Sequence, residues 1–424
     1  MSTPYTEMTA AQLAAESDEL RRQHAVMSSR GVTLDMTRGK PCREQLDLAN
    51  DLLTCVGPAE VAAAQSDIRN YGGLDGLPEA KRFFAEYLDV APDEVVVGGN
   101  SSLAMMYDSL VRAWLFGEPG GPVAWGKLDR VRFVCPSPGY DRHFAICEAL
   151  GIEMIPVAMN SDGPDMDEVE RRVAADPSIK GIWCVPRYSN PTGITYSAST
   201  VERLAAMPAA PDFRIYWDNA YAVHHLTDRP RTLMGILAAC RTAGNPDRPL
   251  LFGSTSKISF AGAGVAVMAG SAANVANQLR AMAVQTIGPD KINQLRHVRY
   301  FRDMAGIEAH MKRHAAIIAP KFAAVRDAFD SQLAPAGVAS LSNPEGGYFF
   351  SLDSLDGTAA RIVELAKAAG VVLTPAGSTF PFKRDPRDCN LRLAPTLPGL
   401  PEIEQAMTVI CTSVRLACLE KLAS

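Results

Sequence analysis

One lysine of this sequence, Lys257, lies in a segment suited to covalent chemistry. It ends the run Ser254-Thr255-Ser256-Lys257, which follows an apolar stretch at 250–252 and precedes a glycine-rich segment at 260–270. A lysine amine is nucleophilic only when deprotonated, and an enclosed site with few water contacts lowers its pKa toward that state. In that state Lys257 can form a Schiff base with an aldehyde. Most lysines are solvated surface groups, so the segment needs support from the rest of the chain.

Three further polar turns follow predicted strands. They are Pro138-Gly139-Tyr140 after a strand at 132–135, Asn190-Pro191-Thr192-Gly193 after a strand at 181–185, and Asp218-Asn219-Ala220-Tyr221 after a strand at 213–217. Each is ordinary turn chemistry when taken alone. In a parallel sheet, however, ligands bind beyond the carboxyl ends of the strands. The spacing therefore predicts that an acid, an amide and two phenols lie at one edge of a sheet.

Two turns are candidates for binding an anion. A strand at 94–97 leads through Gly98-Gly99-Asn100-Ser101-Ser102 into a helix at 103–116, and free N–H groups and the helix dipole at such a start favour a phosphate. Simple N-capping by Ser101 or Ser102 is the alternative. The turn Arg38-Gly39-Lys40-Pro41 is either a solvated turn or a backbone glycine between two cations that faces an anionic ligand.

Length and composition predict a globular protein that acts on small molecules. With 424 residues and 47% hydrophobic content, two domains are expected. The 42 basic and 47 acidic residues form no basic stripe, so we expect neither nucleic acid nor a membrane surface as partner. We find no leader pattern and no apolar run of about 18 residues. Nine cysteines without a CxxC spacing suit reduced thiols, which favours a cytoplasmic location.

The order of elements predicts the α/β class. Strands and helices alternate from about residue 94 to 269, which indicates a parallel or mixed sheet covered on both faces. A long helical stretch follows from 290 to about 329, and the remainder up to a closing helix at 401–419 reads as an α+β unit. We predict a large domain at 58–299 and a small domain built from 1–57 and 300–424.

Some apparent motifs fail. The segment at 121–128 nearly matches a P-loop but lacks the Ser or Thr that would hold magnesium. The glycines at 262, 264 and 270 do not have the dinucleotide-binding spacing. His310 and His314 lie four apart on a predicted helix, but no general base stands between them. We expect these two histidines on a solvated face and predict no metal site.

The motifs resemble a known family when they are read together in chain order. The chain resembles the fold-type I pyridoxal-phosphate aminotransferases of class I/II over nearly its whole length, and within them the type Ic bacterial aspartate aminotransferases. The resemblance is carried by Thr37-Arg38-Gly39-Lys40-Pro41, Asn100-Ser101-Ser102, Asn190-Pro191-Thr192-Gly193, Ser254-Thr255-Ser256-Lys257 and Asn390-Leu391-Arg392. It implies the fold of these transferases: a mostly parallel sheet between helices, plus a small α+β domain made of both chain ends.

The resemblance implies pyridoxal 5′-phosphate as cofactor and a role for each matching residue. Lys257 would hold the cofactor as a Schiff base and move protons, and Asp218 would pair with its ring nitrogen. Asn190 and Tyr221 would bind its phenolic oxygen, and Tyr140 would stack on its ring. The catalytic residues are thus expected to be Lys257, Asp218 and Tyr221.

The phosphate and substrate ends are assigned in the same way. Ser101, Ser102 and Ser254 would bind the phosphate, and Tyr71 would reach it from the neighbouring subunit of a homodimer with shared active sites. Arg392 would bind the substrate α-carboxylate, for which lysine is a poor replacement. Gly39 and Asn190 would also lie against the substrate.

The sequence departs from the family at one position and leaves another open. Many relatives carry an arginine eight residues after the lysine, where it pairs with the phosphate, but this chain has Val265. A dicarboxylate would also need a cation for its distal carboxylate. Lys291 is the first candidate, ahead of Arg38, Arg142 and Arg187, although a solvated lysine near a helix start is the alternative reading of Lys291.

The expected function is therefore that of an aminotransferase which moves an amino group from an L-amino acid, aspartate first, to a 2-oxo acid such as 2-oxoglutarate. A lyase or decarboxylase on the same fold is one alternative, because Lys257 and Asp218 serve any chemistry that begins at Cα. A non-catalytic aminotransferase-like regulator domain is another. The pattern begins by about residue 31, which leaves too little chain before it for a DNA-binding module and a linker.

Overall fold

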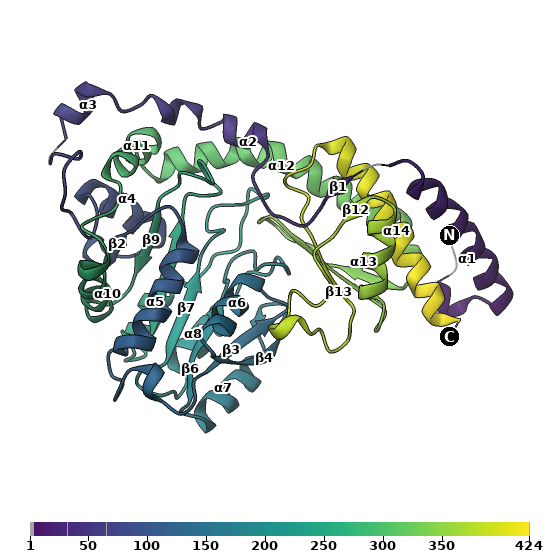
Figure 1. Cartoon of the computed structure of the whole chain (residues 1–424), viewed down its shortest axis with the longest axis horizontal. Coiled ribbons are helices and arrows are strands. Elements are labelled where there is room, and N and C mark those ends of the chain that lie inside the picture. Colours follow the sequence, from purple (N-terminus) through teal and green to yellow (C-terminus); the bar gives the residue numbers. More distant parts are fainter. Residues whose placement is uncertain (1–3, 32, 65, 424) are drawn as a thin grey trace.

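The computed structural model describes residues 4–31, 33–64 and 66–423, which form a large and a small body connected by a long helix, α12 (Met304–Gln332) (Figure 1). The large body is built on an eight-stranded sheet in the order β2-β9-β8-β7-β6-β3-β4-β5. The strands span Val95–Val97 (β2), Arg132–Ser137 (β3), Glu153–Asn160 (β4), Gly163–Pro164 (β5), Ile179–Cys184 (β6), Arg214–Asp218 (β7), Pro249–Ser254 (β8) and Ala266–Ala269 (β9). The α/β class is confirmed.

Strands β4, β3, β6, β7 and β8 are parallel, and their side chains alternate between two separate cores. In β7, Ile215 and Trp217 enter the core on one face of the sheet, whereas Tyr216 enters the core on the other. Each face is therefore buried, which explains why these strands are continuous apolar runs rather than alternating ones.

Helices from the chain segments between the strands cover both faces. Helices α5 (Ser102–Phe116) and α6 (Asp141–Ala149) contribute to the core on the Tyr216 face. Helices α4 (Pro78–Leu88), α7 (Met166–Ala175), α8 (Ala198–Ala206) and α9 (Ile236–Thr242) contribute to the core on the opposite face. The remaining helices of this part are α2 (Arg43–Asp47), α3 (Pro58–Ala62), α10 (Ala272–Gln285) and α11 (Lys291–Phe301).

Strand β9 is antiparallel to both of its neighbours. The segment 255–265 that joins it to β8 contains no helix. A parallel return needs a crossover of a dozen or more residues, so this short connection can only turn the chain back. The connection carries Lys257, which places the lysine directly beyond the carboxyl end of β8.

The small body combines both ends of the chain. It contains the antiparallel strands β10 (Ala339–Leu341), β11 (Phe350–Ser354) and β13 (Asn390–Leu393), the parallel pair β1 (Leu34–Asp35) and β12 (Val371–Val372), and helices α1 (Ala10–Ser28), α13 (Ala359–Ala368) and α14 (Leu400–Leu422). Leu20 and Leu34 share one core with Leu391 and Ile410. Both labelled chain ends lie at this end of the molecule (Figure 1).

Helix α12 belongs to both bodies. Ile307 and Met311 pack in the core of the large body, and Ile318 and Phe322 pack in that of the small body. The helix therefore crosses from one core to the other within its own length. We propose a small domain of residues 1–57 with 300–424 and a large domain of residues 58–299. This division assigns α12, which both cores share, to the small domain.

The structure adds two local features and corrects one expectation. Helix α10 was not predicted from the sequence. The N-cap of α4 is Leu77, and the Asp75 carboxylate two residues before it binds the Lys81 ammonium. His310 and His314 do not face solvent: they are 3% and 2% exposed. Tertiary packing of α12 against the lysine-bearing turn buries them.

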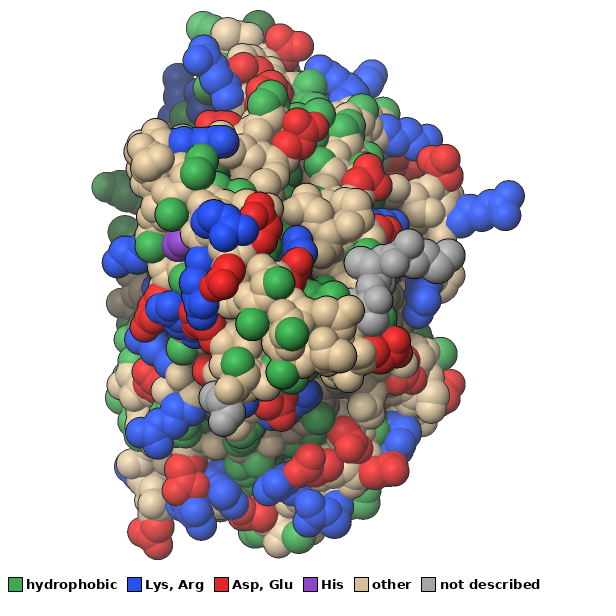
Figure 2. Space-filling view, turned by 90° about the vertical axis from the view of Figure 1, so that its right-hand side faces the viewer, with side chains coloured by type: hydrophobic (Ala, Val, Ile, Leu, Met, Phe, Trp, Pro, Cys, Tyr) green, Lys and Arg blue, Asp and Glu red, His purple; other side chains and the backbone are tan. Residues whose placement is uncertain are grey.

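The end of the small body opposite the large one carries acidic and basic side chains interspersed with each other (Figure 2).

Among the described residues, no helix combines the length and apolar character that a membrane crossing needs. The same residues contain no group of three or more His, Cys, Asp or Glu side chains arranged to hold a metal ion.

Candidate active site

A cavity of about 230 Å³ lies beyond the carboxyl ends of the central strands. The connections after β3, β6, β7 and β8 each supply part of its wall, as expected for a parallel sheet. Of the residues predicted to contact a cofactor, all except Tyr71 line it: Ser101, Ser102, Tyr140, Asn190, Asp218, Tyr221, Ser254 and Lys257. Asn100 and Ser256 line it as well.

Lys257 lies in a tight turn that starts at the end of β8. The N–H groups of Ile258 and Ser259 both donate to the Thr255 carbonyl, at 2.9 and 2.8 Å, and form a single helical turn around the lysine. The lysine Nζ lies 4.9 Å from the centre of the Tyr221 ring. Burial lowers the pKa of Lys257, and the nearby Asp218 carboxylate opposes that effect only in part. The site therefore favours a deprotonated amine.

Asp218 is the last residue of β7, and one of its two carboxylate oxygens is satisfied. His143 Nε2 donates to Asp218 Oδ2 at 3.0 Å. The His143 ring is in turn stacked on Trp183, with ring centres 4.2 Å apart and planes at 7°. Asp218 Oδ1 is buried without any hydrogen-bond partner. A buried unpaired carboxylate oxygen is costly unless a ligand supplies the missing donor.

The two phenols of the cavity are neutral. Burial raises the pKa of Tyr221 well above its usual value, and burial likewise raises the pKa of Tyr140. Tyr140 contacts His143 edge to face, with ring centres 4.9 Å apart. Both side chains can therefore act as hydrogen-bond donors.

The opposite end of the cavity is lined by hydroxyl groups at the start of α5. Ser101 is the N-cap of α5, and its Oγ accepts from Ala104 N at 3.3 Å. Ser256 Oγ donates to the Asn100 carbonyl at 2.9 Å, and Ser254 Oγ contacts Ser256 Oγ at 3.3 Å. Ser101 thus caps the helix and also faces the cavity, so the two readings of this turn are compatible. Among the described residues that line the cavity, Lys257 is the only cation.

Val265 does not face these hydroxyl groups. Its side chain is 2% exposed and belongs to the core of the large body. Its N–H donates to Thr255 Oγ1 at 2.9 Å, and its carbonyl accepts from Thr255 N at 2.9 Å. The position that carries the phosphate-binding arginine in many relatives therefore serves here to close the connection between β8 and β9.

Arg392, on β13, reaches from the small body toward the cavity. Its Nη1 donates to Asp141 Oδ1 at 2.8 Å and approaches Asn190 Oδ1 at 3.5 Å. Its guanidinium lies 5.1 Å from the centre of the Phe349 ring. The side chain is 8% exposed, and its Nε is buried without a partner. The guanidinium is thus held by several contacts, and its Nε remains an unused donor.

Gly39 packs directly against the ring that supports Arg392. A Cβ at this position would lie 2.4 Å from Phe349 Cζ, far inside contact distance. Only glycine allows the turn 38–41 to approach Phe349 this closely. Arg38, its neighbour, is exposed.

Lys291 has partners other than a substrate in this structure. Its Nζ donates to the carbonyls of Asn70 and Gly72, at 2.5 and 2.7 Å, and the residue is 7% exposed. It does begin a helix, α11, but it is not solvated. Its ammonium holds the loop that carries Tyr71, whose own side chain is 83% exposed. Of the other candidate cations, Arg142 is exposed, and Arg187 Nη1 donates to the Arg231 carbonyl at 3.0 Å.

Comparison with known proteins agrees with this geometry. The aspartate amino-transferase family model matches residues 8–424. An aspartate aminotransferase of Corynebacterium glutamicum is 48% identical over 409 residues, which is 96% of this chain and 94% of that protein. The chain belongs to the aspartate amino-transferase family.

Solved structures extend the comparison. A crystal structure of an aspartate transaminase from Corynebacterium glutamicum superposes with a TM-score of 0.96 at 46% identity, covering 99% of this chain and 100% of the other. An α-aminoadipate aminotransferase from Thermus thermophilus, in complex with N-(5′-phosphopyridoxyl)-L-leucine, has a TM-score of 0.73 at 20% identity, covering 94% and 95%, and shares the fold. The protein is therefore an enzyme, an aminotransferase with the fold-type I architecture.

Sequence reasoning missed two polar residues of this aminotransferase. His143 follows Tyr140 by three residues, and that spacing on a helix would have placed both on one face. Ser256 was passed over within the Ser254–Lys257 motif, although it lines the cavity beside Ser254. Neither residue is distinguishable from an ordinary helix or turn residue until the neighbouring strands are placed.

Proposed function

We propose that this aminotransferase moves the amino group of L-aspartate, or of a closely related dicarboxylic amino acid, to a 2-oxo acid such as 2-oxoglutarate, with pyridoxal 5′-phosphate as cofactor. The choice of aspartate is supported by relatives of 46–48% identity that are named as aspartate aminotransferases. The cofactor is supported by the family and by the donors and acceptors of the cavity.

The single observation that carries the proposal is the unpartnered oxygen of Asp218. Asp218 Oδ1 is buried at a cavity that also holds a lysine of lowered pKa. A protonated pyridine nitrogen would supply the donor that this oxygen lacks. When bound, the cofactor supplies an electron-accepting ring for the charge that develops at the substrate Cα.

The chain's own residues would then divide the work. Lys257 Nζ, whose pKa is lowered by burial, would take the proton from Cα of the bound amino acid. His143 holds Asp218 through Oδ2 and leaves Oδ1 free for the ring. Tyr221 and Asn190, which line the cavity, would donate hydrogen bonds to the phenolic oxygen, and Tyr140 would cover the ring face.

A phosphate would be held at the hydroxyl-lined end by neutral donors. Ser101, Ser102 and Ser254 line that end, and the N-terminus of the 15-residue helix α5 adds its free N–H groups and its dipole. Ser256 lines the same part of the cavity, but its hydroxyl already donates to the Asn100 carbonyl. Because the lining supplies no arginine, these dipoles and a group from a second subunit take over the neutralisation.

The substrate would be held by Arg392 through its α-carboxylate. Arg392 Nε has no partner, and Nη2 makes only long contacts of 3.4 Å with the Thr37 carbonyl and with Thr374 Oγ1. A carboxylate that binds both nitrogens would complete the guanidinium. We do not assign the distal carboxylate to Lys291 of the same chain, because its ammonium already binds two carbonyls.

We also propose a homodimer with shared active sites. Tyr71 is 83% exposed on a loop that Lys291 holds in place. Leu115 and Phe116 at the end of α5, and Val284 and Ile287 at and after the end of α10, are between 57% and 84% exposed. Exposed apolar side chains of this kind mark interaction surfaces.

The nine cysteines are all unpaired, in keeping with a cytoplasmic location.

The test is a half-reaction. The purified protein is loaded with pyridoxal 5′-phosphate and mixed with L-aspartate in the absence of any 2-oxo acid, and the visible absorbance and the released product are followed. Loss of the visible band together with oxaloacetate supports the proposal. Alanine in place of oxaloacetate would indicate decarboxylation instead. The Lys257→Ala variant, with the same circular dichroism spectrum, is the control and should release neither product.

A further inference from the structure

The turn that carries Lys257 is surrounded by histidines. Three consecutive residues of the turn each contact an imidazole. His224 Nε2 donates to the Lys257 carbonyl at 3.2 Å, His310 Nε2 donates to the Ile258 carbonyl at 2.8 Å, and Ser259 Oγ lies 2.8 Å from His297 Nε2. The chain contains seven histidines in all, so this concentration around one turn is not typical of the rest of the molecule.

These histidines come from three separate parts of the chain. His224 follows β7, His297 lies on α11, and His310 lies on α12. A fourth histidine, His314, is one helical turn further along α12, and its Nε2 lies 3.0 Å from His310 Nε2. We call these four residues the histidine collar. Each of its members is at most 3% exposed.

The hydrogen-bond directions follow from the partners. A ring nitrogen that faces a carbonyl must carry the proton, so His224 and His310 are donors to the turn. His297 Nδ1 donates to the Asn293 carbonyl at 2.8 Å, which leaves its Nε2 as the acceptor for the Ser259 hydroxyl.

The collar is also connected to α2 and to the segment before β11. Gln45 Nε2 lies 3.0 Å from His314 Nδ1 and donates to Tyr348 Oη at 3.0 Å. Tyr348 Oη in turn donates to the Lys257 carbonyl at 3.3 Å. The lysine turn is therefore connected to α2, to the segment before β11, and to α12, the helix that packs in both cores.

Imidazoles suit this place because they donate hydrogen bonds without adding charge. Burial lowers the pKa of all four: well below the usual value for His224, to about 4 for His297, to about 3 for His314, and below the usual value for His310. Lysine or arginine donors at the same positions would repel the protonated form of Lys257. Apolar residues would remove a donor from each of the carbonyls of Lys257 and Ile258.

We propose that the histidine collar positions Lys257. It fixes the orientation of the lysine side chain and connects the lysine turn to α12, so that the lysine moves with the helix shared by the two bodies. The inference rests on the proposed function only in taking Lys257 as the reactive residue. His224, His297, His310 and His314 do not themselves touch the substrate; they act through the turn.

The experiment compares three variants of the full chain. His310→Leu removes the donor to Ile258, and His310→Gln keeps a donor of similar reach. His24→Leu is the matched control, because His24 Nε2 binds the Leu365 carbonyl at 2.8 Å, the same kind of contact in the small body. The measurements are the Tm, the pH dependence of Lys257 acetylation in the cofactor-free chain by peptide mass spectrometry, and the rate of loading with pyridoxal 5′-phosphate.

We expect His310→Leu to shift the pH profile of Lys257 acetylation and to slow loading by about 10- to 100-fold, the scale expected when a reacting group is displaced by an ångström. His310→Gln should restore both, and His24→Leu should lower only the Tm. A His310→Leu variant that changes no more than His24→Leu overturns the proposal. If His310→Leu does not fold, Ser259→Ala, which removes the hydroxyl that binds His297, is measured in the same way.

A failure of the proposed aminotransferase function would give a different result from a failure of the collar proposal. A wild-type chain that never takes up the cofactor at Lys257 would contradict the aminotransferase chemistry in every variant alike. The acetylation profile of the cofactor-free chain would still report whether the collar positions the lysine.

Discussion

Arg392, the residue that we propose binds the substrate carboxylate, already holds a carboxylate of its own chain. Asp141 Oδ1 lies 2.8 Å from Arg392 Nη1, and the Asp141 side chain is 35% exposed, so it can move away. A substrate carboxylate that binds Arg392 would enter next to this negative charge or replace it. We therefore expect Asp141 to lower the affinity of the site for a carboxylate and to keep the guanidinium oriented when no substrate is present.

Asp141→Asn removes that charge with little change of shape. We expect KM for amino acids to fall by about two- to fivefold, corresponding to no more than the ~1 kcal/mol of a partly solvated ion pair, with kcat within about twofold of wild type. The separate measurement of kcat and KM decides the matter. A rise in KM would mean that Asp141 orients Arg392 more than it competes with the substrate.

Arg392→Lys tests the guanidinium itself. Lysine keeps the charge but cannot bind a carboxylate through two parallel hydrogen bonds. We expect kcat/KM to fall. The decrease should correspond to a loss of about 2–4 kcal/mol of transition-state stabilisation, as when a desolvated charge pair is broken. Arg142→Lys, at an exposed neighbouring position, is the control and should change kcat/KM by less than about twofold. An equally small effect at Arg392 would place the carboxylate elsewhere.

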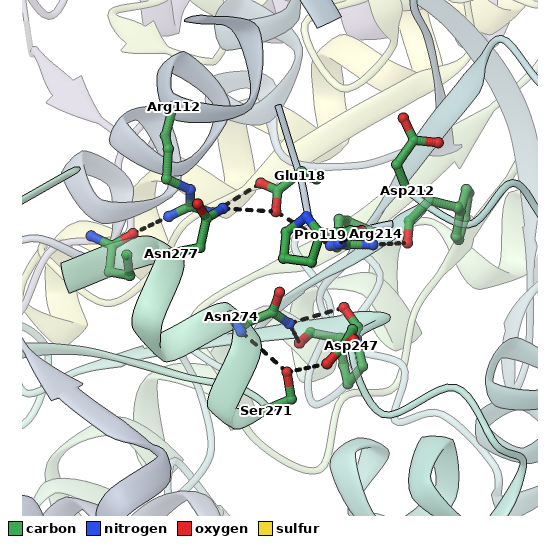
Figure 3. Close-up of polar contacts among 12 residues, drawn as sticks. Arg112, Glu118, Pro119, Asp212, Arg214, Asp247, Ser271, Asn274 and Asn277 are labelled. Atoms are coloured by element: carbon green, nitrogen blue, oxygen red, sulfur yellow. Dashed lines mark hydrogen bonds and ion pairs between the residues drawn. The ribbon is translucent and has the colours of Figure 1, made fainter. Parts of the chain in front are cut away.

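At the scale of elements, a buried ionic cluster fixes the end of β7 that lies away from the cavity (Figure 3). Glu118 accepts from Arg112 on α5 at 2.9 Å, and its other oxygen lies 3.4 Å from Arg214 Nε, at the first residue of β7. Arg214 also donates to the Pro119 carbonyl at 2.6 Å. The side chains are at most 2% exposed, so the cluster binds α5, β7 and the loop at 117–121 as one unit.

Glu118→Gln leaves two buried guanidinium groups without a negative partner. We expect the free energy of unfolding to fall by about 3–5 kcal/mol, the cost of breaking a buried pair on one side. The exposed pair Arg387–Asp356 provides the control, since Asp356→Asn should leave the urea midpoint almost unchanged. Because the cluster lies far along β7 from Asp218, activity per folded molecule should stay near wild type. Equal midpoints for the two variants would contradict this assignment.

At the scale of the whole molecule, the histidine collar makes stability depend on pH. The pKa of His314 is lowered to about 3 by burial and by His310, against about 6.5 in the unfolded chain. The unfolded state therefore binds the proton first, and stability present above pH 6.5 is lost as pH falls toward 3. At pH 5 the titration of this single group lowers the free energy of unfolding by about 2 kcal/mol relative to neutral pH.

We therefore expect the Tm of the wild-type protein to fall between pH 7 and pH 5 more steeply than that of a His310→Gln, His314→Gln double variant. Glutamine does not titrate, so the double variant retains only the pH dependence of the other groups. The measurement is the Tm at several pH values in buffers of equal ionic strength. Parallel curves would show that the collar histidines do not carry the acid sensitivity.

Much of the local structure was accessible from the sequence. The strand predicted at 213–217 is β7, shifted by one residue, and the helix predicted at 401–419 is α14, extended by a few residues at its ends. The turns that follow β3, β6, β7 and β8 were recognised because a buried parallel strand is a short apolar run that ends in Gly, Pro, Asn or Asp. Residues at those ends were therefore expected at one edge of the sheet, where the structure has them.

Contacts between distant segments were not accessible in the same way. The periodicity of α12 does not show whether His310 and His314 face water or the Lys257 turn, because that depends on which element packs against the helix. The same holds for Lys291, whose spacing from Lys257 suggested a substrate contact and whose ammonium binds the loop of Tyr71. Helix α10 and the reversal of β9 were likewise decided by packing and by the length of the connection.

The amino-acid sequence by itself thus determined the α/β class, most of the order of the elements and most of the polar residues that line the cavity, since these depend on local propensity and on motifs in chain order. The tertiary structure alone decided what each polar group binds: His143 on Asp218, Asp141 on Arg392, and four histidines around Lys257. The physical reason is that a buried polar group must find a partner wherever packing places it, and that partner is as a rule distant in the sequence.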